Sequence, residues 1–348
     1  MKLENTKKIV IKIGSSLLFD EKTNKLNKEW LISLAEDVNF LKNKNKEVII
    51  VSSGAIAFGA KDLNLEMSEL RLDIHQALAA VGQIQLMSAF KNAFEKHESK
   101  VSQILLTLDD TEKRRRSINA RRTIDNLLKL NIVPIVNEND TIATNEIKYG
   151  DNDRLAARVA QIAGADCLIL LSNINGLYSS DPKNNKELKL IDSVESIDET
   201  IENMAGKSIS ETGKGGMKTK IMAAKTALSA GCHMAITNGT VKNPIQALFN
   251  GRPCTWFTPS KTPLAARKQW IVGTMQAVGS VMIDSGASEA LINGSSLLPA
   301  GILEVHGEFE RGDAIEILSS DKNKIGIGLS SYSSEEGKKI MGHKSNEI

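Results

Sequence analysis

Acidic and amide side chains crowd into residues 136–161, which read VNENDTIATNEIKYGDNDRLAARVAQ. The carboxylates are Glu138, Asp140, Glu146, Asp151 and Asp153, and an apolar run with helical spacing follows them. Like charges this close repel each other, so the cluster favours a bound cation or a role in binding. The structural alternative is helix capping by Asp151 beside solvated acids.

Two loops of small residues could bind phosphate groups. The first follows Lys12 in the run IKIGSS and contains Gly14 and Ser15. The second is VSSGAIAFGA, whose open residues are Ser53, Gly54 and Ala55. Backbone amides exposed in such loops bind anions, and a lysine on the adjoining strand adds positive charge. Taken singly, each loop could instead be a packing turn beside a surface lysine.

A third glycine-rich stretch, SETGKGGMKTKIMAAKTA, runs into a predicted helix. Lys214, Lys218 and Lys220 lie near the amino end of that helix. Cations at this end oppose the helix dipole, so their placement indicates an anion between the lysines and the helix amides. A solvated charge run is the alternative.

Together these stretches predict transfer of a phosphoryl group between two reactants. If the lysine-bearing loops hold phosphates, the acidic loop is left to hold the second reactant. Asp140 could bind a substrate ammonium, while Asn137 and Asn152 could donate to substrate carboxylates. Asp153, at the start of the next helix, could accept hydrogen bonds from Lys12 and Lys220 and fix their positions.

Other nucleotide and metal motifs fail on inspection. AGKS at residues 205–208 resembles the end of a Walker A loop, but Ile201 stands where that loop needs glycine. No GxGxxG run occurs, and the five histidines are scattered. Cys167, Cys232 and Cys254 are widely spaced, so we interpret them as reduced structural residues.

The elements that must position these loops alternate along the chain. Apolar strand-like runs occur at residues 7–14, 47–51, 101–106, 131–136 and 166–171, and helical spacing occurs at 27–44, about 71–97, 117–130 and 152–163. Such alternation predicts an α/β fold with a mostly parallel sheet covered on both faces by helices. Ligands bind beyond the carboxyl ends of the strands in such sheets, and the unusual loops follow strands at that end.

Length and composition allow more than one domain. The chain has 348 residues and a net charge of +2, which argues against a polyanion-binding surface over the whole molecule. No apolar run reaches the ~18 residues of a membrane span, and the amino terminus lacks the apolar core of a signal peptide. We therefore expect a cytoplasmic protein that does not bind a membrane.

The alternation stops near residues 258–272, which contain prolines and several basic residues. Short strand-like runs punctuated by Gly, Asp and Asn follow. We expect a catalytic domain at 1–258, a linker at 259–273 and a small β-rich domain at 274–348.

The chain resembles the glutamate 5-kinase family, whose members combine an amino acid kinase fold with a small C-terminal PUA domain resembling a β-barrel. The resemblance is carried, in family order, by IKIGSS, VSSGAIAFG, AAVGQ, IVPIVNEND, EIKYGDND, GGMKTK, GSSLLPAGI and RGD. It implies phosphorylation of the γ-carboxylate of L-glutamate by ATP, giving L-glutamyl 5-phosphate in the first step of proline synthesis. It also implies Mg²⁺ carried with the nucleotide, feedback inhibition by proline, and a homo-oligomer such as a dimer or tetramer.

The resemblance assigns roles to particular residues. It implies that Lys12 and Lys220 contact the transferring phosphoryl group, that Asp153 organises them, and that Ser53, Asp140 and Asn152 hold glutamate, with Gly54, Ala55 and Asn137 in the same substrate loops. The nucleotide residues it implies are Lys12, Gly14, Ser15, Ser172, Asn173, Lys214, Gly215, Gly216, Met217, Lys218, Thr219 and Lys220. No metal-ligating side chains are assigned.

Two departures and two alternatives accompany the resemblance. Ser172-Asn173 stands where the family usually has Thr-Asp, and Arg114, Arg115 and Arg116 form a basic row that is either a solvated helix start or a subunit contact. The alternatives are another enzyme of the fold, acting on acetylglutamate or aspartate, or an RNA-binding PUA protein. RNA binding is disfavoured because residues 274–348 hold six Lys or Arg against eleven Asp or Glu.

Overall fold

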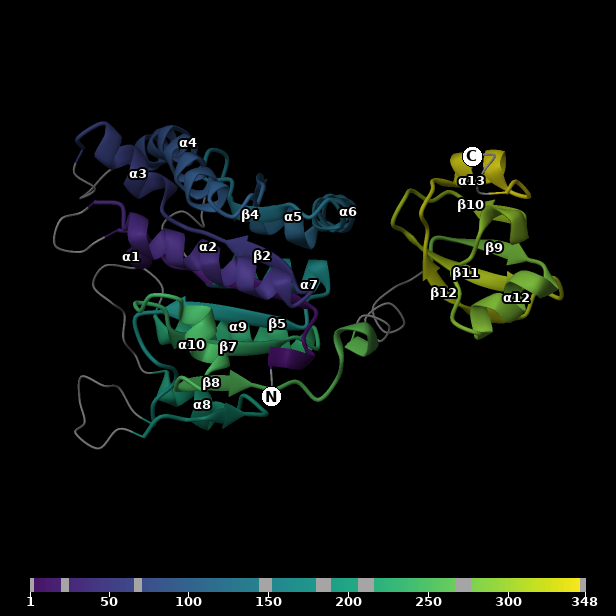
Figure 1. The fold of residues 1–348 in the computed structure, drawn as a ribbon. Coiled ribbons are helices and arrows are strands. Elements are labelled where there is room, and N and C mark those ends of the chain that lie inside the picture. Colours follow the sequence, from purple (N-terminus) through teal and green to yellow (C-terminus); the bar gives the residue numbers. More distant parts are fainter. Residues whose placement is uncertain are drawn as a thin grey trace. The chain divides into compact units, whose positions relative to one another are not determined.

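The computed structural model describes residues 3–19, 25–65, 71–143, 152–179, 189–205, 216–266 and 277–344. The chain forms two compact units, Met1–Leu264 and Ala265–Ile348 (Figure 1). The first unit contains the loops singled out above.

The first unit is built on an eight-stranded sheet in the order β3-β4-β2-β1-β5-β7-β8-β6. Its strand pairs are parallel except for β7 with β8. The strands are β1 Lys8–Ile13, β2 Glu47–Val51, β3 Val101–Leu106, β4 Val133–Glu138, β5 Cys167–Ser172, β6 Ser193–Val194, β7 His233–Asn238 and β8 Cys254–Phe257. The mostly parallel sheet predicted from the sequence is confirmed.

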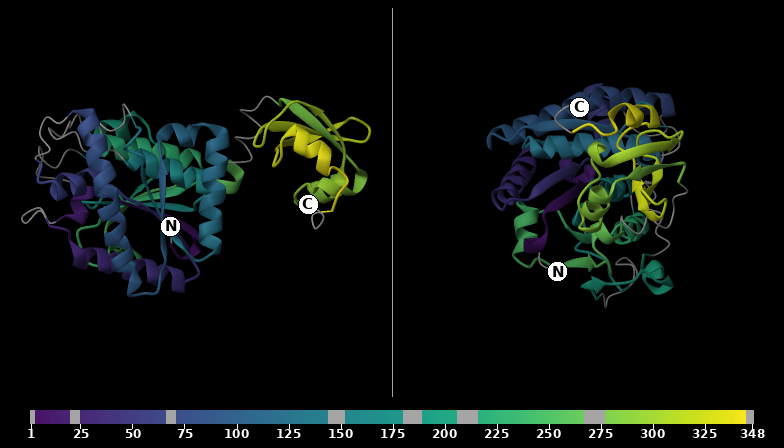
Figure 2. Two further views of the ribbon diagram at one scale, coloured as in Figure 1. Left: turned by 90° about the horizontal axis from the view of Figure 1, so that it is seen from above. Right: turned by 90° about the vertical axis from the view of Figure 1, so that its right-hand side faces the viewer.

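Helices cover the sheet on both faces (Figures 1 and 2). They are η1 Leu3–Asn5, α1 Ser15–Leu18, α2 Lys28–Asn43, α3 Ala55–Asp62, α4 Leu72–Glu95, α5 Leu108–Glu112, α6 Arg114–Lys129, α7 Asn152–Ala163, α8 Glu199–Met204, α9 Met217–Ser229 and α10 Pro244–Phe249. The predicted helix at 152–163 has the observed bounds, and the one predicted at about 71–97 runs from Leu72 to Glu95.

The side chains of β1 point alternately into two hydrophobic cores, one on each face of the sheet. Ile9, Ile11 and Ile13 are fully buried against a layer that includes α2, α4 and α10. Val10 lies in the other core, with α6, α7 and α9. Because successive side chains of a strand point to opposite faces, Lys12 shares the face of Val10 and is directed toward α7 and α9.

Helices α3 and α4 cross at two glycines. A Cβ atom on Gly82 would lie 1.8 Å from the carbonyl oxygen of Ala55, and one on Gly59 would lie 1.9 Å from that of Leu78. No other residue allows the two backbones to approach so closely. The crossing fixes the amino end of α3, which follows the loop of Ser53 and Gly54, against the middle of α4.

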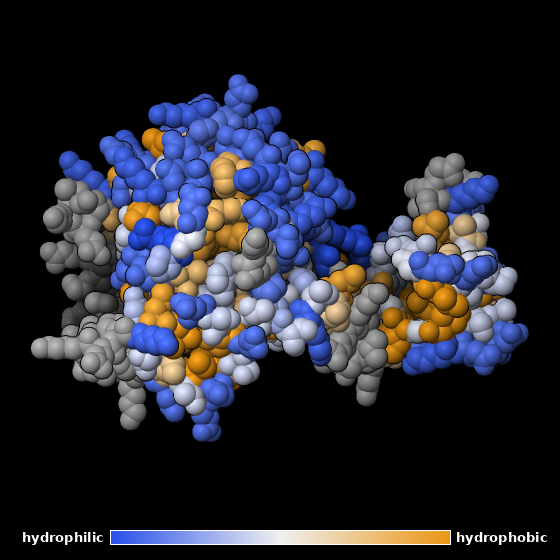
Figure 3. Space-filling view, turned by 60° about the horizontal axis from the view of Figure 1, so that its bottom comes forward, coloured by the Kyte–Doolittle hydropathy of each residue, from blue (hydrophilic) through white to orange (hydrophobic). Residues whose placement is uncertain are grey.

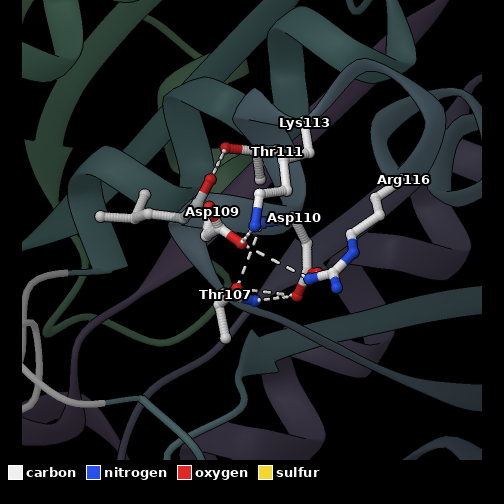
Figure 4. Close-up of polar contacts among 7 residues, drawn as sticks. Thr107, Asp109, Asp110, Thr111, Lys113 and Arg116 are labelled. Atoms are coloured by element: carbon white, nitrogen blue, oxygen red, sulfur yellow. Dashed lines mark hydrogen bonds and ion pairs between the residues drawn. The ribbon is translucent and has the colours of Figure 1, made fainter.

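The basic row at Arg114–Arg116 begins α6 and is balanced in part by the acids of α5. Arg116 pairs with Asp110 at 2.8 Å and with Asp109 at 3.4 Å, and Lys113 pairs with Asp109 at 2.8 Å (Figure 4). Thr107 and Asp110 cap α5 reciprocally. These ion pairs are largely exposed and contribute little to stability.

The second unit contains a four-stranded sheet in the order β10-β9-β11-β12. Its elements are β9 Gly279–Ile283, α12 Ser285–Ile292, η3 Pro299–Gly301, β10 Ile302–Gly307, β11 Ala314–Ser319, β12 Lys324–Leu329 and α13 Ser334–Ile340. Its core includes Val281, Ile283, Val305, Phe309 and Ile315. Ile292, Leu298 and Leu303 are exposed, and apolar surface is visible on this unit in Figure 3.

Two further features concern the described part of the chain. Cys167, Cys232 and Cys254 are buried free thiols, and burial raises the pKa of each. None of the helices described is long and apolar enough to cross a membrane.

Candidate active site

A buried aspartate between two lysines forms the centre of the site. Lys12 Nζ lies 2.6 Å from Asp153 Oδ1, and Lys220 Nζ lies 3.0 Å from Asp153 Oδ2. Asp153 is fully buried, while the two lysines are 8% and 7% exposed. Three segments distant in sequence, at the ends of β1, α7 and α9, therefore meet at one carboxylate.

The charges of this centre depend on one another. Burial alone would raise the pKa of Asp153, but the charges and hydrogen bonds of Lys12 and Lys220 outweigh burial and hold that pKa well below its usual range. Asp153 also lies in the first turn of α7, where the helix dipole favours a carboxylate. The centre thus holds two lysine charges against one carboxylate.

The amino end of α9 supplies a further contact to this carboxylate. Thr219 Oγ1 lies 3.2 Å from Asp153 Oδ2 and 2.8 Å from the carbonyl oxygen of Gly216, the residue before the helix. Gly216 makes no side-chain cap, Met217 is half-buried and Lys218 is exposed. The anion predicted to compensate lysines at this end is supplied, for Lys220, by Asp153 within the protein. The predicted nucleotide residues Lys214 and Gly215 lie outside the described residues.

The two small-residue loops lie next to each other. A Cβ atom on Gly54 would be 3.7 Å from Cβ of Ser15. Gly54 has φ = 105°, a left-handed conformation that favours glycine, and it precedes α3 at Ala55. Gly14 likewise precedes α1, and among the described residues a Cβ atom added to it would have only Ser16 Oγ, at 3.7 Å, within contact distance. Ser53 is half-buried.

A chain of buried amides links the ends of β2 and β4 to α7 and α4. Asn152 Nδ2 donates to the carbonyl oxygen of Ser52 and to Asn137 Oδ1, the latter at 2.8 Å. Asn137 Nδ2 in turn donates to Gln83 Oε1 at 2.8 Å. We call Ser52, Asn152, Asn137 and Gln83 the amide chain.

The amide chain bears on one prediction from the sequence. Asn137 and Asn152 were expected to donate to substrate carboxylates, but their Nδ2 groups donate within the protein. Asn137 is only 2% exposed and Asn152 only 4%. Buried amides satisfy one another because an unpaired buried donor costs free energy. AAVGQ carries no signal that assigns a role to Gln83, and no sequence pattern distinguishes Ser52 from Ser53.

Asp140 lies apart from the lysines, in the turn that follows β4. The amide of Ala143 donates to the carbonyl oxygen of Asn139, which closes the turn around Asp140 at 3.1 Å. Burial raises the pKa of Asp140 to about 6. The carboxylate is half-buried, so it is available to a cationic partner near neutral pH.

Ser172 and Asn173 lie at the carboxyl end of β5, on the opposite side of β1 from the amide chain. Ser172 Oγ lies 3.4 Å from Asn173 Oδ1, and Asn173 is exposed. The site residues therefore divide along the sheet edge. Lys12 and Asp153 lie in the middle, the substrate residues on the β2–β4 side, and Ser172 and Asn173 on the β5 side.

The described residues contain no group of three or more His, Cys, Asp or Glu side chains that could hold a metal ion. The most buried carboxylate of the centre, Asp153, is engaged by two lysines.

Comparison with known proteins gives matches to both units. Residues 7–238 match the amino acid kinase family and residues 279–348 match the PUA domain. A "Glutamate 5-kinase" of Pelagibacter ubique is 56% identical over 99% of this chain and 94% of its own length. One of Agrobacterium fabrum is 52% identical over 98% of this chain and 87% of its own.

A solved structure shares the fold of the first unit. The UMP kinase of Ureaplasma parvum matches 72% of this chain and 98% of its own, with a TM-score of 0.52 and 18% identity. At that identity the likeness concerns the fold alone.

Proposed function

Since the chain belongs to the amino acid kinase family, and within it to the glutamate 5-kinases, we propose that it transfers the γ-phosphoryl group of ATP to the γ-carboxylate of L-glutamate. The product is L-glutamyl 5-phosphate, and the reaction is the first step of proline biosynthesis. The observation that carries the proposal is the pairing of Lys12 and Lys220 on buried Asp153 at the end of the sheet.

Phosphoryl transfer requires alignment of donor and acceptor and neutralisation of charge on the transferring group. Lys12 on β1 and Lys220 on α9 reach the same carboxylate, and Asp153 holds both ammonium groups in place. They stabilise the negative charge of the equatorial oxygens in the transition state. A γ-carboxylate is ionised at pH 7, so no residue is needed as a general base.

Glutamate is held on the β2–β4 side of the lysines. Asp140 binds its ammonium group, and Asn152 offers its oxygen atom to the same group because its amide hydrogens are used in the amide chain. The loop of Ser53, Gly54 and Ala55 presents backbone amides to a carboxylate. Asn137 shapes this pocket by holding Asn152.

ATP is held on the β5 side. Ser172, Asn173 and the amino end of α9 lie beside the lysines there, and Gly14 and Ser15 leave the backbone after β1 open to phosphate oxygens. Mg²⁺ bound to the nucleotide supplies further neutralisation of the phosphate charges. The serine and asparagine in place of Thr-Asp remove one negative charge beside the nucleotide.

The activity is tested by measuring ADP release with a panel of amino acids that includes glutamate, aspartate and N-acetylglutamate. Trapping the acyl phosphate with hydroxylamine identifies the product as a carboxyl phosphate. Of these amino acids, we expect only glutamate to support substantial ADP release. Equal or faster release with aspartate or acetylglutamate, or none with glutamate, would reject the proposed function.

The role of Asp140 predicts a pH dependence for glutamate binding. The folded pKa of Asp140 is raised to about 6, so its charge is present above pH 6 and is lost as the pH falls through that value. Glutamate KM should rise as the pH is lowered from 7 to 5, by up to about tenfold per unit below pH 6, while ATP KM changes little.

Asp140→Asn is the matched variant, because it keeps the shape and removes the charge. Its glutamate KM should be high at pH 7 and should show no rise between pH 7 and 5. A variant with the wild-type pH profile, or one that changes the ATP KM instead, would contradict the assignment.

Proline shares the α-amino acid group of glutamate, and we propose that it inhibits by occupying the same pocket at Ser53, Asp140 and Asn152. Raising the glutamate concentration should then restore the rate, and Asp140→Asn should weaken the binding of both proline and glutamate. Inhibition that saturating glutamate leaves unchanged would exclude a shared pocket.

A further inference from the structure

Helix α4 holds both ends of the turn that contains Asp140. Gln83 Oε1 accepts from Asn137 Nδ2 at 2.8 Å, before the turn. Gln76 Nε2 donates to the carbonyl oxygen of Ala143 at 3.0 Å, after the turn. The glutamines are seven residues apart, two helical turns, and so share one face of α4.

We infer that Gln76 and Gln83 are positioning residues for the acceptor substrate, acting through the loop from Asn137 to Ala143. This inference rests on the proposed function, because it names residues that orient its glutamate pocket. Gln83 orients the side chain of Asn137, which in turn accepts from Asn152. Gln76 fixes the carbonyl of Ala143, whose amide closes the turn around Asp140.

The neighbouring residue links α4 to the other substrate loop. Gly82 packs so closely on α3 that a Cβ atom there would lie 1.8 Å from the carbonyl oxygen of Ala55. One helical turn of α4 thus contacts the loop of Gly54 and Ala55 through residue 82 and the loop of Asn137 through residue 83. The two acceptor loops are set at a fixed separation by the same rigid element.

The amide of Gln83 is poorly suited to a purely structural role. Gln83 is 9% exposed, and its Nε2 atom is buried without a hydrogen-bond partner among the residues described. A methionine of similar length would remove this unpaired donor but would leave the Nδ2 group of Asn137 without its acceptor. Stability alone therefore does not distinguish the two side chains, whereas the orientation of Asn137 requires an acceptor at this position.

The test compares Gln83→Met and Gln76→Met with Gln85→Met, a control on the exposed side of the same helix. Loss of one neutral hydrogen bond typically weakens binding by about five- to tenfold. Each of the first two variants should raise the KM for glutamate by roughly that factor, with the ATP KM within about twofold of wild type. Their melting temperatures should stay within about 2 °C of wild type, and the control should match wild type throughout.

Rescue separates orientation from packing. Gln83→Glu keeps an oxygen that accepts from Asn137, so its glutamate KM should return to within about threefold of wild type. The inference is overturned if Gln83→Met leaves the glutamate KM unchanged or raises both KM values alike, or if Gln83→Glu has a glutamate KM as high as that of Gln83→Met. A wild-type protein without glutamate-dependent ADP release would instead reject the proposed function, whatever the variants do.

Discussion

Lys220→Met is expected to lower kcat by about 10² to 10³ while leaving the protein folded. The ammonium group of Lys220 is held at the reaction centre by Asp153 at 3.0 Å, and removing one charged donor from a transition state typically costs roughly 3 to 4 kcal/mol. Lys12→Met should show a loss of the same order, because Lys12 contacts the other oxygen of the same carboxylate. Steady-state rates at saturating ATP and glutamate measure both effects.

Lys225→Met is the matched control for this loss. Lys225 lies on the same helix, is exposed, and pairs with Glu202 rather than with the centre. Its kcat should stay close to wild type. A Lys220→Met or Lys12→Met enzyme that retains kcat within about threefold would remove less than ~1 kcal/mol and would refute the catalytic assignment.

Asp153→Asn should produce the largest loss of stability among the site variants. It leaves two buried lysines without their shared carboxylate, and breaking a buried ion pair by removing one partner costs about 3 to 5 kcal/mol. At about 2 to 4 °C per kcal/mol for a unit of this size, the first unit should melt roughly 6 to 20 °C lower. The kcat should fall as well, because neither lysine is fixed.

The loss of stability in Asp153→Asn should be smaller at acidic pH. The pKa of Asp153 is depressed in the folded protein, so its contribution to stability is present above the unfolded pKa and is lost as the pH falls toward the folded one. The difference in melting temperature between wild type and Asp153→Asn should therefore narrow in acid.

Asp109→Asn provides the control, since Asp109 also lies between two cations but at the surface (Figure 4). It should cost no more than about 1 kcal/mol. Equal effects of the two substitutions would mean that Asp153 does not organise a buried charge centre.

Local patterns were sufficient to predict much of the fold. Apolar strand-like runs that alternate with helical spacing predicted the parallel sheet, and the helix at residues 152–163 was predicted with its observed bounds. These features depend on neighbouring residues alone, since the turn propensity of Gly54 and the apolar run of residues 7–14 are local properties. The motifs NEND, GDND and GGMKTK, in their order along the chain, then indicated the family.

The partners of the site residues depended on the tertiary structure. The side-chain amides of Asn137 and Asn152 can donate to a substrate or to groups of the protein, and the sequence does not distinguish these cases. Only the approach of β4 to α7 made the two residues partners. Gln83 looks like any helical glutamine until α4 crosses α3 at Gly82 and brings residue 83 to the end of β4. The rise of the Asp140 pKa to about 6 likewise comes from burial, which is set by the packing of segments far apart along the chain and not by the residues on either side.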